Sequence, residues 1–423
     1  MKVCILGLGY IGLPTALMFA NHQTEVHGVD INLDIIDKLN EKELHIYEPG
    51  LKELFCKALE IGKITFSTMP VHSDAFIVSV PTPVNKDKSA DLTFVVKAIE
   101  MIIPFLQKGN LIVLESTVPP RTVVHTVLPL LEKTKFEIGK ELFVSYSPER
   151  VLPGNLINEI VNNDRIIGGI NDQSTELAED LYKRFVKGKI HKTNSTTAEI
   201  VKLIENTYRD INIAFANELA RIGSSLGINI WDAIELANNH PRVNIHKPGP
   251  GVGGHCIAVD PWFIIHEFPH EAELIKLARK QNELIPLSIV KTVENIVEHI
   301  EDPTITLLGL SYKGNVDDIR ESPSLQILSC LKDKKYKVKV YDPYVQLKIP
   351  QKYEHLNEAV KGSDCLLILT DHDDFLQLDF GELSKHVRTK KIFDTRNIIN
   401  PENAIKHDFI YHLLGNGNQK KSP

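Results

Sequence analysis

Apolar residues near the N-terminus follow the pattern of a strand, a helix and a second strand. The run KVCILGLG is strand-like, YIGLPTALMFANH has helical character, and TEVHGVD returns to a strand pattern. Further strand-like runs occur at FIVSVP, NLIVLEST, LFVSYSP and DRIIGG, separated by segments long enough for crossover helices. We therefore expect an N-terminal domain with a parallel sheet, extending to about residue 190.

The hydrophobic period changes beyond this domain. A long amphipathic helix is predicted from Thr196 to Leu226, with Glu199 three residues after Thr196 as in a capping box, and Gly227 after its end. More helix is expected to about residue 300, interrupted by the glycine-rich loop HKPGPGVGGHC. A helix of this length is typical of a link between domains.

After Asp302-Pro303 the chain repeats features of its beginning. The runs LLGLSYK, KVKVYDP and SDCLLILT resemble ILGLGYI, EVHGVDI and SDAFIVSV. The matched positions are Gly7 with Gly309, Asp30 with Asp342, and Ser73-Asp74 with Ser363-Asp364. The predicted fold is α/β: two Rossmann-like, doubly wound parallel-sheet domains (1–190 and 301–423) joined by a central helical domain (191–300) with a long linking helix. The tail GNGNQKKSP has the composition of a frayed terminus.

Composition excludes several classes of partner. The 423 residues suggest two or three domains, and 43% hydrophobic with 24% charged residues is ordinary for a soluble globular protein. A net charge of −7 without a long basic block argues against nucleic acid and against an anionic membrane surface. Outside the start of the chain no apolar run reaches the roughly 18 residues of a membrane span.

The cysteines and the first residues indicate the compartment. Five cysteines, without disulfide or metal-ligand spacing, point to a reducing environment and to packing roles for most of them. The apolar start MKVCILGLGYIGLPTALMF is broken by three glycines and leads into an acidic, helix-like segment, unlike a signal peptide. We expect a cytoplasmic protein.

The first turn has the features of a dinucleotide site. GLGYIG, from Gly7 to Gly12, fits the GxGxxG pattern between a strand and a helix, where backbone can approach a pyrophosphate. Asp30 ends the next strand, 18 residues past Gly12, where a carboxylate can bind a ribose diol and repel a 2′-phosphate. Together they predict NAD rather than NADP. Thr82 and Thr117 lie at strand ends, where a hydroxyl either contacts a ligand or caps the next helix.

Two segments farther along carry candidate chemistry. Lys202, Asn206 and Arg209 share one face of the long helix, which is either a solvated face or part of a site. In GPGVGGHCIAVDP, Cys256 follows glycines that leave its sulfur accessible, so it is a candidate nucleophile. His255 either lowers the pKa of this thiol as a neighbouring cation or is a hydrogen-bonded structural residue. A cysteine would allow a dehydrogenase to oxidise twice, through a thiohemiacetal and a thioester.

A third segment, SYKGNVDDIRESPS, supplies Lys313 and Arg320 in a turn of the C-terminal domain. These cations either bind phosphate or carboxylate, or are neutralised by Asp317 and Asp318. The charges alone do not choose between the two.

Taken together, GLGYIGLP, VPTP, EST, SPERVLPG, ENTYRDINIAFANE, GPGVGGHCIAVDP and SYKGNVDDIRESP resemble the UDP-glucose/GDP-mannose dehydrogenase family over roughly residues 1 to 400. SPERVLPG, NHPRVNIH and GGHCIAVDPWF are most similar to the branch that acts on UDP-N-acetylmannosamine. The resemblance implies NAD-dependent, four-electron oxidation of the C6 alcohol of a UDP-sugar, for surface polysaccharide synthesis. It also implies an NAD-binding first domain, a central domain with the catalytic Lys and Cys, a UDP-sugar-binding third domain and a homodimer.

The resemblance also assigns roles to residues. The implied catalytic residues are Cys256 as nucleophile, Lys202 as acid/base and oxyanion-stabilising group, Asn206 beside it, and Asp260 for water activation. The implied cofactor contacts are Gly7, Gly9, Tyr10, Ile11, Gly12, Asp30, Thr82, Thr117 and Arg320. The implied substrate contacts are Glu149, Arg150, Val151, Lys202, Asn206, Arg209, His240, Arg242, Gly253, Tyr312, Lys313 and Arg396. No residue is assigned to a metal.

The sequence departs from the UDP-glucose branch at one point and leaves other functions open. That branch has a second carboxylate four residues after the first, where this chain has Glu149 and then Pro153. UDP-N-acetylglucosamine and UDP-glucose remain alternative substrates. A two-electron dehydrogenase of the 3-hydroxyacid type would need neither the cysteine nor the third domain, and an NAD-binding sensor would need neither Lys202 nor Cys256.

Overall fold

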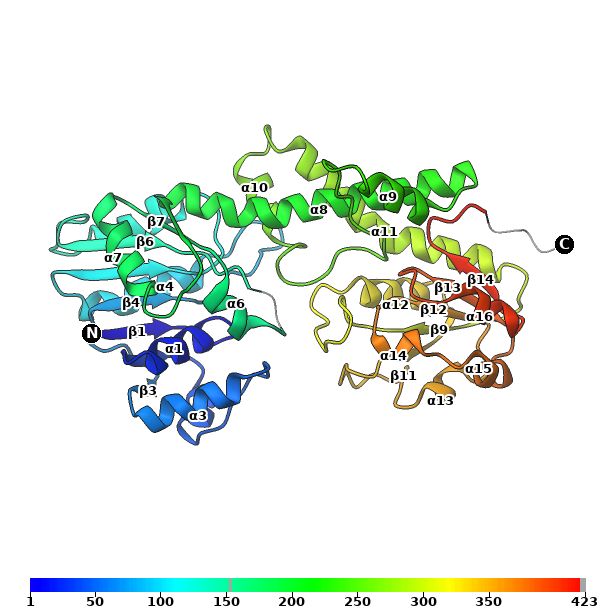
Figure 1. The fold of residues 1–423 in the computed structure, drawn as a ribbon, viewed down its shortest axis with the longest axis horizontal. Helices are drawn as coiled ribbons and strands as arrows, with labels where there is room; N and C mark the ends of the chain where they lie inside the picture. The colour runs from blue at the N-terminus through cyan, green and yellow to red at the C-terminus, as the bar shows by residue number, and fades with distance from the viewer. Residues whose placement is uncertain (152–153, 419–423) are drawn as a thin grey trace. The chain divides into compact units, whose positions relative to one another are not determined.

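The computed structural model describes residues 1–151 and 154–418 (Figure 1). The chain divides into two compact units, Met1–Glu205 with Trp262–Pro269, and Asn206–Pro261 with His270–Pro423, and each is described by itself. In the described ranges, no helix combines the length and the apolar character needed to cross a bilayer.

The first unit is built on an eight-stranded sheet with the strand order β3-β2-β1-β4-β5-β6-β7-β8. The strands are β1 (Lys2–Leu6), β2 (Glu25–Val29), β3 (Ile64–Ser67), β4 (Ala75–Val78), β5 (Asn110–Leu114), β6 (Leu142–Tyr146), β7 (Arg165–Gly169) and β8 (Ile190–Asn194). Its first six strands have the order 3-2-1-4-5-6 of a dinucleotide-binding fold.

Helices cover both faces of this sheet (Figure 1). Residues of α1, α3 and α7 pack on one face and residues of α4, η2 and α5 on the other, in two separate hydrophobic clusters. The helices are α1 (Gly12–Asn21), α2 (Leu33–Asn40), α3 (Leu51–Ile61), α4 (Thr93–Ile102), η1 (Ile103–Phe105), η2 (Val123–Val127), α5 (Leu128–Leu131), α6 (Leu156–Asn162) and α7 (Asp172–Tyr182). The predicted doubly wound architecture is confirmed.

The last two strands of the first sheet, β7 and β8, run opposite to the first six, because β8 pairs parallel with the reversed β7. The segment DRIIGG forms β7, which pairs antiparallel with β6, so the expectation of a wholly parallel sheet is wrong at this position. The reversal brings Arg165, the first residue of β7, to the carboxyl end of β6. There its guanidinium donates to the Ser147 hydroxyl (3.0 Å) and to the Glu149 carboxylate. The antiparallel strand therefore delivers a buried cation to the edge of the sheet where α/β proteins bind ligands.

The second unit contains a parallel six-stranded sheet with the order β11-β10-β9-β12-β13-β14. Its strands are β9 (Thr304–Leu308), β10 (Lys337–Tyr341), β11 (Lys352–Tyr353), β12 (Cys365–Ile368), β13 (Lys391–Asp394) and β14 (Ile410–Leu413). Its helices are α12 (Pro323–Asp333), α13 (Leu356–Val360), α14 (Asp373–Leu376), α15 (Phe380–His386) and α16 (Pro401–Lys406). Residues of α11 and α12 pack on one face, and residues of α13 to α16 on the other.

The predicted internal repeat has a structural counterpart. Gly7 and Gly309 both adopt a positive φ, of 89° and 99°. Asp30 accepts a hydrogen bond from Leu8 N–H (2.9 Å), and Asp342 accepts the matching bond from Leu310 N–H (2.6 Å). The two glycine turns therefore share one construction.

Asp342 differs from Asp30 in its further contacts. It is buried, accepts hydrogen bonds from the N–H groups of Tyr344 and Val345, and lies 3.2 Å from the ring Nε2 of His372. Burial alone would raise the pKa of Asp342, but the hydrogen bonds from His372 and the backbone lower it to about 2. This carboxylate is an internal structural group.

The long helix α8 (Ser195–Leu226) begins one residue before its predicted start. Its first turn is capped by Asn194, whose side chain accepts from Thr197 N–H (2.8 Å). Glu199 makes no capping box: its carboxylate accepts from the N–H groups of Arg121 (2.6 Å) and Val123 (2.8 Å) and so joins α8 to the start of η2. Burial raises the pKa of Glu199 to about 7, against the lowering effect of these two donors.

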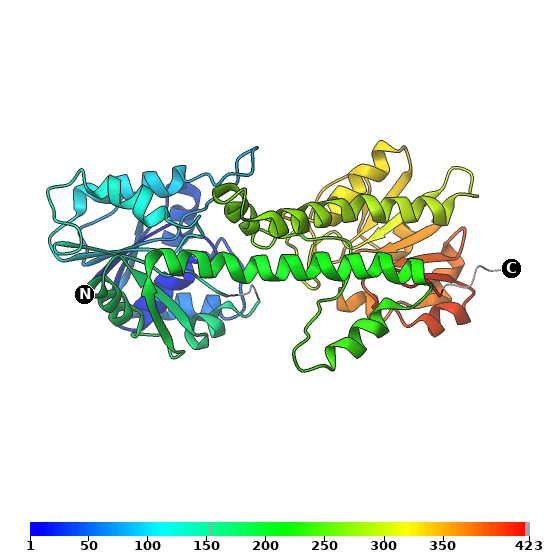
Figure 2. The same cartoon turned by 90° about the horizontal axis from the view of Figure 1, so that it is seen from above.

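In the second unit, α8 packs on α11 (Glu273–Val297). Asp210 of α8 binds the buried guanidinium of Arg279 (2.5 Å) and the amide of Asn282 (2.8 Å), both from α11. Figure 2 shows these two long helices running side by side, as the contacts require. The remaining central helices are α9 (Ile230–Asn238) and α10 (Asp260–Glu267).

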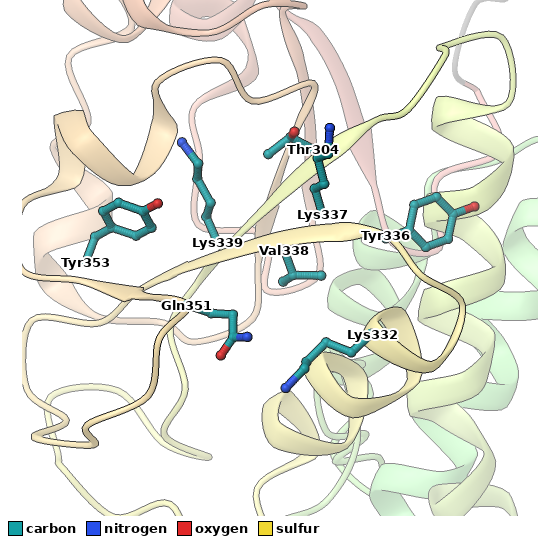
Figure 3. Close-up of a pocket in the computed structure, with 8 residues that line it drawn as sticks. All are labelled: Thr304, Lys332, Tyr336, Lys337, Val338, Lys339, Gln351 and Tyr353. Atoms are coloured by element: carbon teal, nitrogen blue, oxygen red, sulfur yellow. The ribbon is translucent and has the colours of Figure 1, made fainter.

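A hollow of about 440 Å³ opens along the edge of the second sheet (Figure 3). It is lined by Thr304, Lys332, Tyr336, Lys337, Val338, Lys339, Gln351 and Tyr353. The short β11 pairs only with the last two residues of β10, so the lysine-bearing first half of β10 borders the hollow. Lysines on such an edge oppose the addition of a further strand. The predicted site residues lie elsewhere.

Candidate functional site

The first glycine turn leaves room for a ligand at one position and has no spare room at the other two. A Cβ on Gly7 would lie 2.5 Å from the carbonyl oxygen of Ser79, and one on Gly12 would lie 1.8 Å from that of Gly7. A Cβ on Gly9 would meet no atom within 4 Å. Gly7 and Gly12 are thus needed for the turn itself, whereas Gly9 faces open space at the N-terminus of α1, where a pyrophosphate can approach the backbone.

Asp30 stands beside this turn, as predicted. One carboxylate oxygen accepts from Leu8 N–H (2.9 Å) and the other from Asn32 N–H (2.9 Å), which fixes the group at the end of β2. Its side chain is only half-buried, so it is accessible to a ribose. Tyr10 is exposed and Ile11 is partly exposed in the same turn. The turn and the carboxylate together fit the diphosphate and ribose of NAD.

We expect NAD to be used in strong preference to NADP, because the Asp30 carboxylate would face the 2′-phosphate. Asp30→Ser should narrow the ratio of the two kcat/KM values by about tenfold or more, since the like-charge repulsion is removed. Asp30→Asn is the matched variant, because its amide oxygen retains an acceptor for Leu8 or Asn32. Comparable turnover of the parent enzyme with NAD and NADP would contradict the assignment.

One hydrogen bond joins the two threonines at the strand ends. The buried Thr82 hydroxyl donates to the carbonyl oxygen of Thr117 (2.6 Å), so its proton is engaged by the main chain. Thr117 is partly exposed. This bond holds the VPTP and EST segments together at the carboxyl ends of β4 and β5.

Lys202 and the SPER segment meet within the first unit. The Lys202 amine donates to the main-chain carbonyl of Glu149 (2.7 Å). Arg150 forms an ion pair with Glu205 (2.5 Å), on the same helix as Lys202, and Val151 is partly exposed beside it. The structure thus brings together the predicted residues Lys202, Glu149 and Arg150. Pro153, where the chain departs from the UDP-glucose branch, lies outside the described residues.

Sequence reasoning missed Glu205. It is an acidic residue on an amphipathic helix, and its partner Arg150 is 55 residues away, so no local pattern announces the pair. Arg150 is consequently not a free cation.

In the second unit, the cysteine loop is fastened to the turn after β9. A Cβ on Gly253 would lie 2.5 Å from the Cβ of Tyr312, and one on Gly254 would lie 2.8 Å from its ring. Gly254 also has a φ of +84°, and its N–H donates to the carbonyl of Arg320 (2.9 Å). The glycines are therefore required for close packing, which brings the predicted residues Gly253, Tyr312 and Arg320 together.

Cys256 follows in a turn that leads into α10. Its carbonyl accepts from the N–H groups of Val259 (3.1 Å) and Asp260 (2.8 Å), and the residue is exposed. Asp260, the first residue of α10, is buried and binds the amide of Asn206 through Oδ2 (2.6 Å). The loop thus presents an accessible thiol next to a carboxylate that is held by Asn206.

His255 is not the cation that would lower the pKa of the Cys256 thiol. Desolvation, followed by the charge of Arg320, lowers the pKa of His255 below its usual value. The ring is therefore predominantly neutral at neutral pH, and the nearby positive charge comes from Arg320.

Arg320 is partly neutralised. Its guanidinium binds both carboxylate oxygens of Asp318, at 2.9 Å and 2.7 Å. The hydrogen bonds with Asp318 raise the pKa of Arg320. Burial alone would raise the pKa of Asp318, but the hydrogen bonds from Arg320 lower it below its usual value. Lys313 is exposed in the same turn. Asp318 thus neutralises part of the Arg320 charge.

The other predicted substrate residues differ in exposure. Arg209, His240 and Arg242 are exposed, and Arg209 lowers the pKa of His246 after the larger effect of burial. Arg396 is half-buried and donates to the carbonyl oxygens of Leu369 (2.9 Å) and Tyr312 (3.1 Å). It therefore supports the Tyr312 turn directly. Across residues 1–151 and 154–418, no cluster of three or more His, Cys, Asp or Glu side chains could hold a metal ion.

Comparison with known proteins agrees with this geometry. Three models of the UDP-glucose/GDP-mannose dehydrogenase family match the chain: the NAD binding domain at residues 1–186, the central domain at 196–284 and the UDP binding domain at 306–401. A UDP-N-acetyl-D-mannosamine dehydrogenase from Methanococcus maripaludis is 48% identical, over 98% of this chain and 97% of its own.

Solved structures give the same result. The UDP-N-acetyl-mannosamine dehydrogenase of S. aureus has a TM-score of 0.90 and 45% identity, covering 99% of both chains. The UDP-D-ManNAc dehydrogenase of Pyrococcus horikoshii has a TM-score of 0.93 and 40% identity, covering 99% of this chain and 100% of its own. The chain therefore belongs to the UDP-glucose/GDP-mannose dehydrogenase family, a family of NAD-dependent nucleotide-sugar dehydrogenases.

Proposed function

We propose that this enzyme oxidises the C6 alcohol of UDP-N-acetyl-D-mannosamine to the carboxylate, in two steps, for the synthesis of a surface polysaccharide precursor. The observation that carries the proposal is the accessible Cys256, set in a loop that packs on Tyr312 and followed by the Asp260–Asn206 pair. An alcohol dehydrogenase that stops at the aldehyde has no need of such a nucleophile. The names of the similar proteins support the choice of sugar.

Two NAD molecules, one for each oxidation, would supply the hydride acceptor. Lys202 takes the proton of the C6 hydroxyl and stabilises negative charge on that oxygen. The Cys256 thiolate adds to the aldehyde carbon to form a thiohemiacetal, which becomes a thioester when oxidised. Asp260 accepts a proton from the water that hydrolyses the thioester, which frees the cysteine and gives the acid. Asn206 holds Asp260 in position for this step.

The remaining residues bind the ligands in this proposal. The cofactor contacts are Gly7, Gly9, Tyr10, Ile11, Gly12, Asp30, Thr82, Thr117 and Arg320. The UDP-sugar contacts are Glu149, Arg150, Val151, Arg209, His240, Arg242, Gly253, Tyr312, Lys313 and Arg396. The corresponding division of the chain is 1–190 for NAD, 191–300 for the central helices and 301–423 for the UDP-sugar. The protein works in the cytoplasm.

Purified enzyme supplied with NAD should have its highest kcat/KM with UDP-N-acetylmannosamine and should turn over UDP-glucose poorly. UDP-N-acetylglucosamine is the most informative alternative substrate, because it differs from UDP-N-acetylmannosamine only in the configuration at C2. This difference displaces the N-acetyl group slightly within one pocket. A yield of two NADH molecules per sugar indicates the proposed reaction. A yield of one indicates a two-electron dehydrogenase, and no NADH indicates a sensor. A higher kcat/KM for UDP-glucose would overturn the choice of sugar but leave the family intact.

We further propose that the enzyme is a homodimer formed through the central helices. Tyr208, Phe215 and Ile222 recur every seven residues along α8 and are 53%, 48% and 45% exposed, which makes one apolar stripe. Leu277 and Leu284 of α11 add exposed apolar surface at the same spacing. Stripes of this kind fit a second copy of the chain. Light scattering should then give twice the 47.6 kDa mass of one chain, and a monomer would refute the proposal.

A further inference from the structure

A buried charge cluster lies at the carboxyl end of the first sheet, beneath the SPER segment. The Arg165 side chain is only 4% exposed and contacts Ser147 (3.0 Å), Glu115 (3.4 Å) and Glu149. Its guanidinium carbon also lies 4.2 Å from the ring centre of Tyr182. One cation therefore links three segments that are distant in the sequence.

The cluster has two sides. On one side, the hydroxyl groups of Ser79 and Tyr182 each donate to the Glu115 carboxylate at 2.6 Å. On the other side, Glu149 has a side chain only 8% exposed, and it binds Arg165 through one oxygen and Arg150 N–H through the other (2.8 Å). The Glu115 side stabilises the core, whereas the Glu149 side reaches the segment that contacts α8.

The charges make Arg165 indispensable to this arrangement. Two buried carboxylates face a single guanidinium, and burial raises the pKa of Glu115 while Arg165 opposes that rise. Burial also disfavours the charge on Arg165, but Glu149, Tyr182 and Glu115 raise its pKa above the usual value. Without the cation, Glu149 would lose its anchor and would face a second carboxylate in a dry pocket.

The anchored residue is the one that holds Lys202. Glu149 offers its main-chain carbonyl to the Lys202 amine at 2.7 Å, and its side chain is fixed by Arg165 from below. The same carboxylate accepts from Arg150 N–H, which belongs to the peptide unit of the Glu149 carbonyl, so the anchored side chain restricts the direction of that carbonyl. Arg165 thus acts on the position of the Lys202 amine through two successive contacts. It binds the Glu149 carboxylate, and the Glu149 carbonyl binds the amine.

We propose that Arg165 is a positioning residue for the oxidation: by anchoring the Glu149 carboxylate it aims the Glu149 carbonyl that holds the Lys202 amine against the reacting hydroxyl. This proposal rests on the proposed role of Lys202. Arg165 itself contacts neither the sugar nor the cofactor in this account.

The first test is Arg165→Lys, which keeps the charge but cannot bridge Ser147, Glu115 and Glu149 at once. We expect kcat to fall by about tenfold or more, while KM for the UDP-sugar and for NAD changes by less than about threefold. Tyr182→Phe is the matched control, because it removes a hydrogen bond on the Glu115 side of the same cluster. It should lower Tm but leave kcat within about twofold.

A second variant separates positioning from charge balance. Arg165→Met combined with Glu115→Gln removes the cation and one of the two carboxylates, so the repulsion is relieved but Glu149 stays unanchored. We expect Tm near that of Arg165→Lys and a kcat that remains low. Recovery of the parent kcat in this double variant would show that Arg165 only balances charge, and would overturn the proposal.

A double-mutant cycle with Lys202→Ala tests the route of the effect. If Arg165 acts through Lys202, Arg165→Lys should cost less than about twofold in single-turnover NADH formation once Lys202 is absent. An equal loss in both backgrounds, or an unchanged kcat in Arg165→Lys, would overturn the positioning role alone. Parent-like turnover of Lys202→Ala would instead overturn the role of Lys202, and this proposal with it.

Discussion

Cys256→Ser is expected to abolish steady-state production of NADH from the UDP-sugar. Serine is far less acidic than cysteine, so the nucleophile that attacks the aldehyde is harder to generate, and the ester that would replace the thioester is released more slowly. We expect kcat to fall by roughly three orders of magnitude or more, as when other catalytic nucleophiles are removed. Binding should persist, since the backbone of the loop is held by Gly253, Gly254 and Tyr312.

The chain offers a matched control for this variant. Cys56 on α3 is also an exposed cysteine, and Cys56→Ser should retain full activity. Titration calorimetry should show that Cys256→Ser still binds NAD and UDP-sugar. Mass spectrometry of the variant incubated with substrate tests for an accumulated covalent adduct. If Cys256→Ser still yields two NADH per sugar near the parent rate, direct oxidation of a hydrated aldehyde is the better account.

Lys202→Ala should slow both oxidations rather than the second alone. Proton removal from the hydroxyl and stabilisation of the oxyanion serve each hydride transfer, so kcat should fall by about 10² to 10⁴-fold. The measurement is single-turnover NADH formation, in which the first and second oxidations appear as separate phases. Both phases should be slower.

Lys192→Ala provides the control, because Lys192 lies on β8 and pairs with Glu179 at the surface. Its turnover should match that of the parent. A Lys202→Ala enzyme whose first phase keeps the parent rate would assign proton removal to another group.

Local motifs made much of the site predictable. Gly7, Gly9 and Gly12 act through backbone conformation and close approach within a single turn, and Asp30 ends the very next strand, so the spacing alone identifies them. The glycines before Cys256 are equally local. Their partner Tyr312, however, is 59 residues beyond Gly253, and no periodicity could have indicated that contact.

Strand direction and long-range pairing were the parts that the sequence did not reveal. An apolar run such as RIIGG is the same in parallel and antiparallel pairing, so the direction of β7 could not be read from it. The short strands β3 and β8 carry exposed positions and were not predicted. Glu199 lay at capping-box spacing, yet its carboxylate binds the N–H groups of Arg121 and Val123, which are distant in the sequence.

The repeated glycine turns show one carboxylate position used in two ways. Asp30 keeps an accessible side chain, which the proposed function assigns to the choice of cofactor. Asp342 is wholly engaged by His372 and by backbone donors, and its pKa is lowered to about 2. An aspartate with a depressed pKa stabilises the folded state at pH values above the pKa that it has in the unfolded chain, about 3.9. The stabilisation from Asp342 is therefore present at neutral pH and is lost as the pH falls toward 2. The position that the proposed function assigns to cofactor choice in the first copy of the turn therefore stabilises the fold at neutral pH in the second copy, and acid removes that contribution.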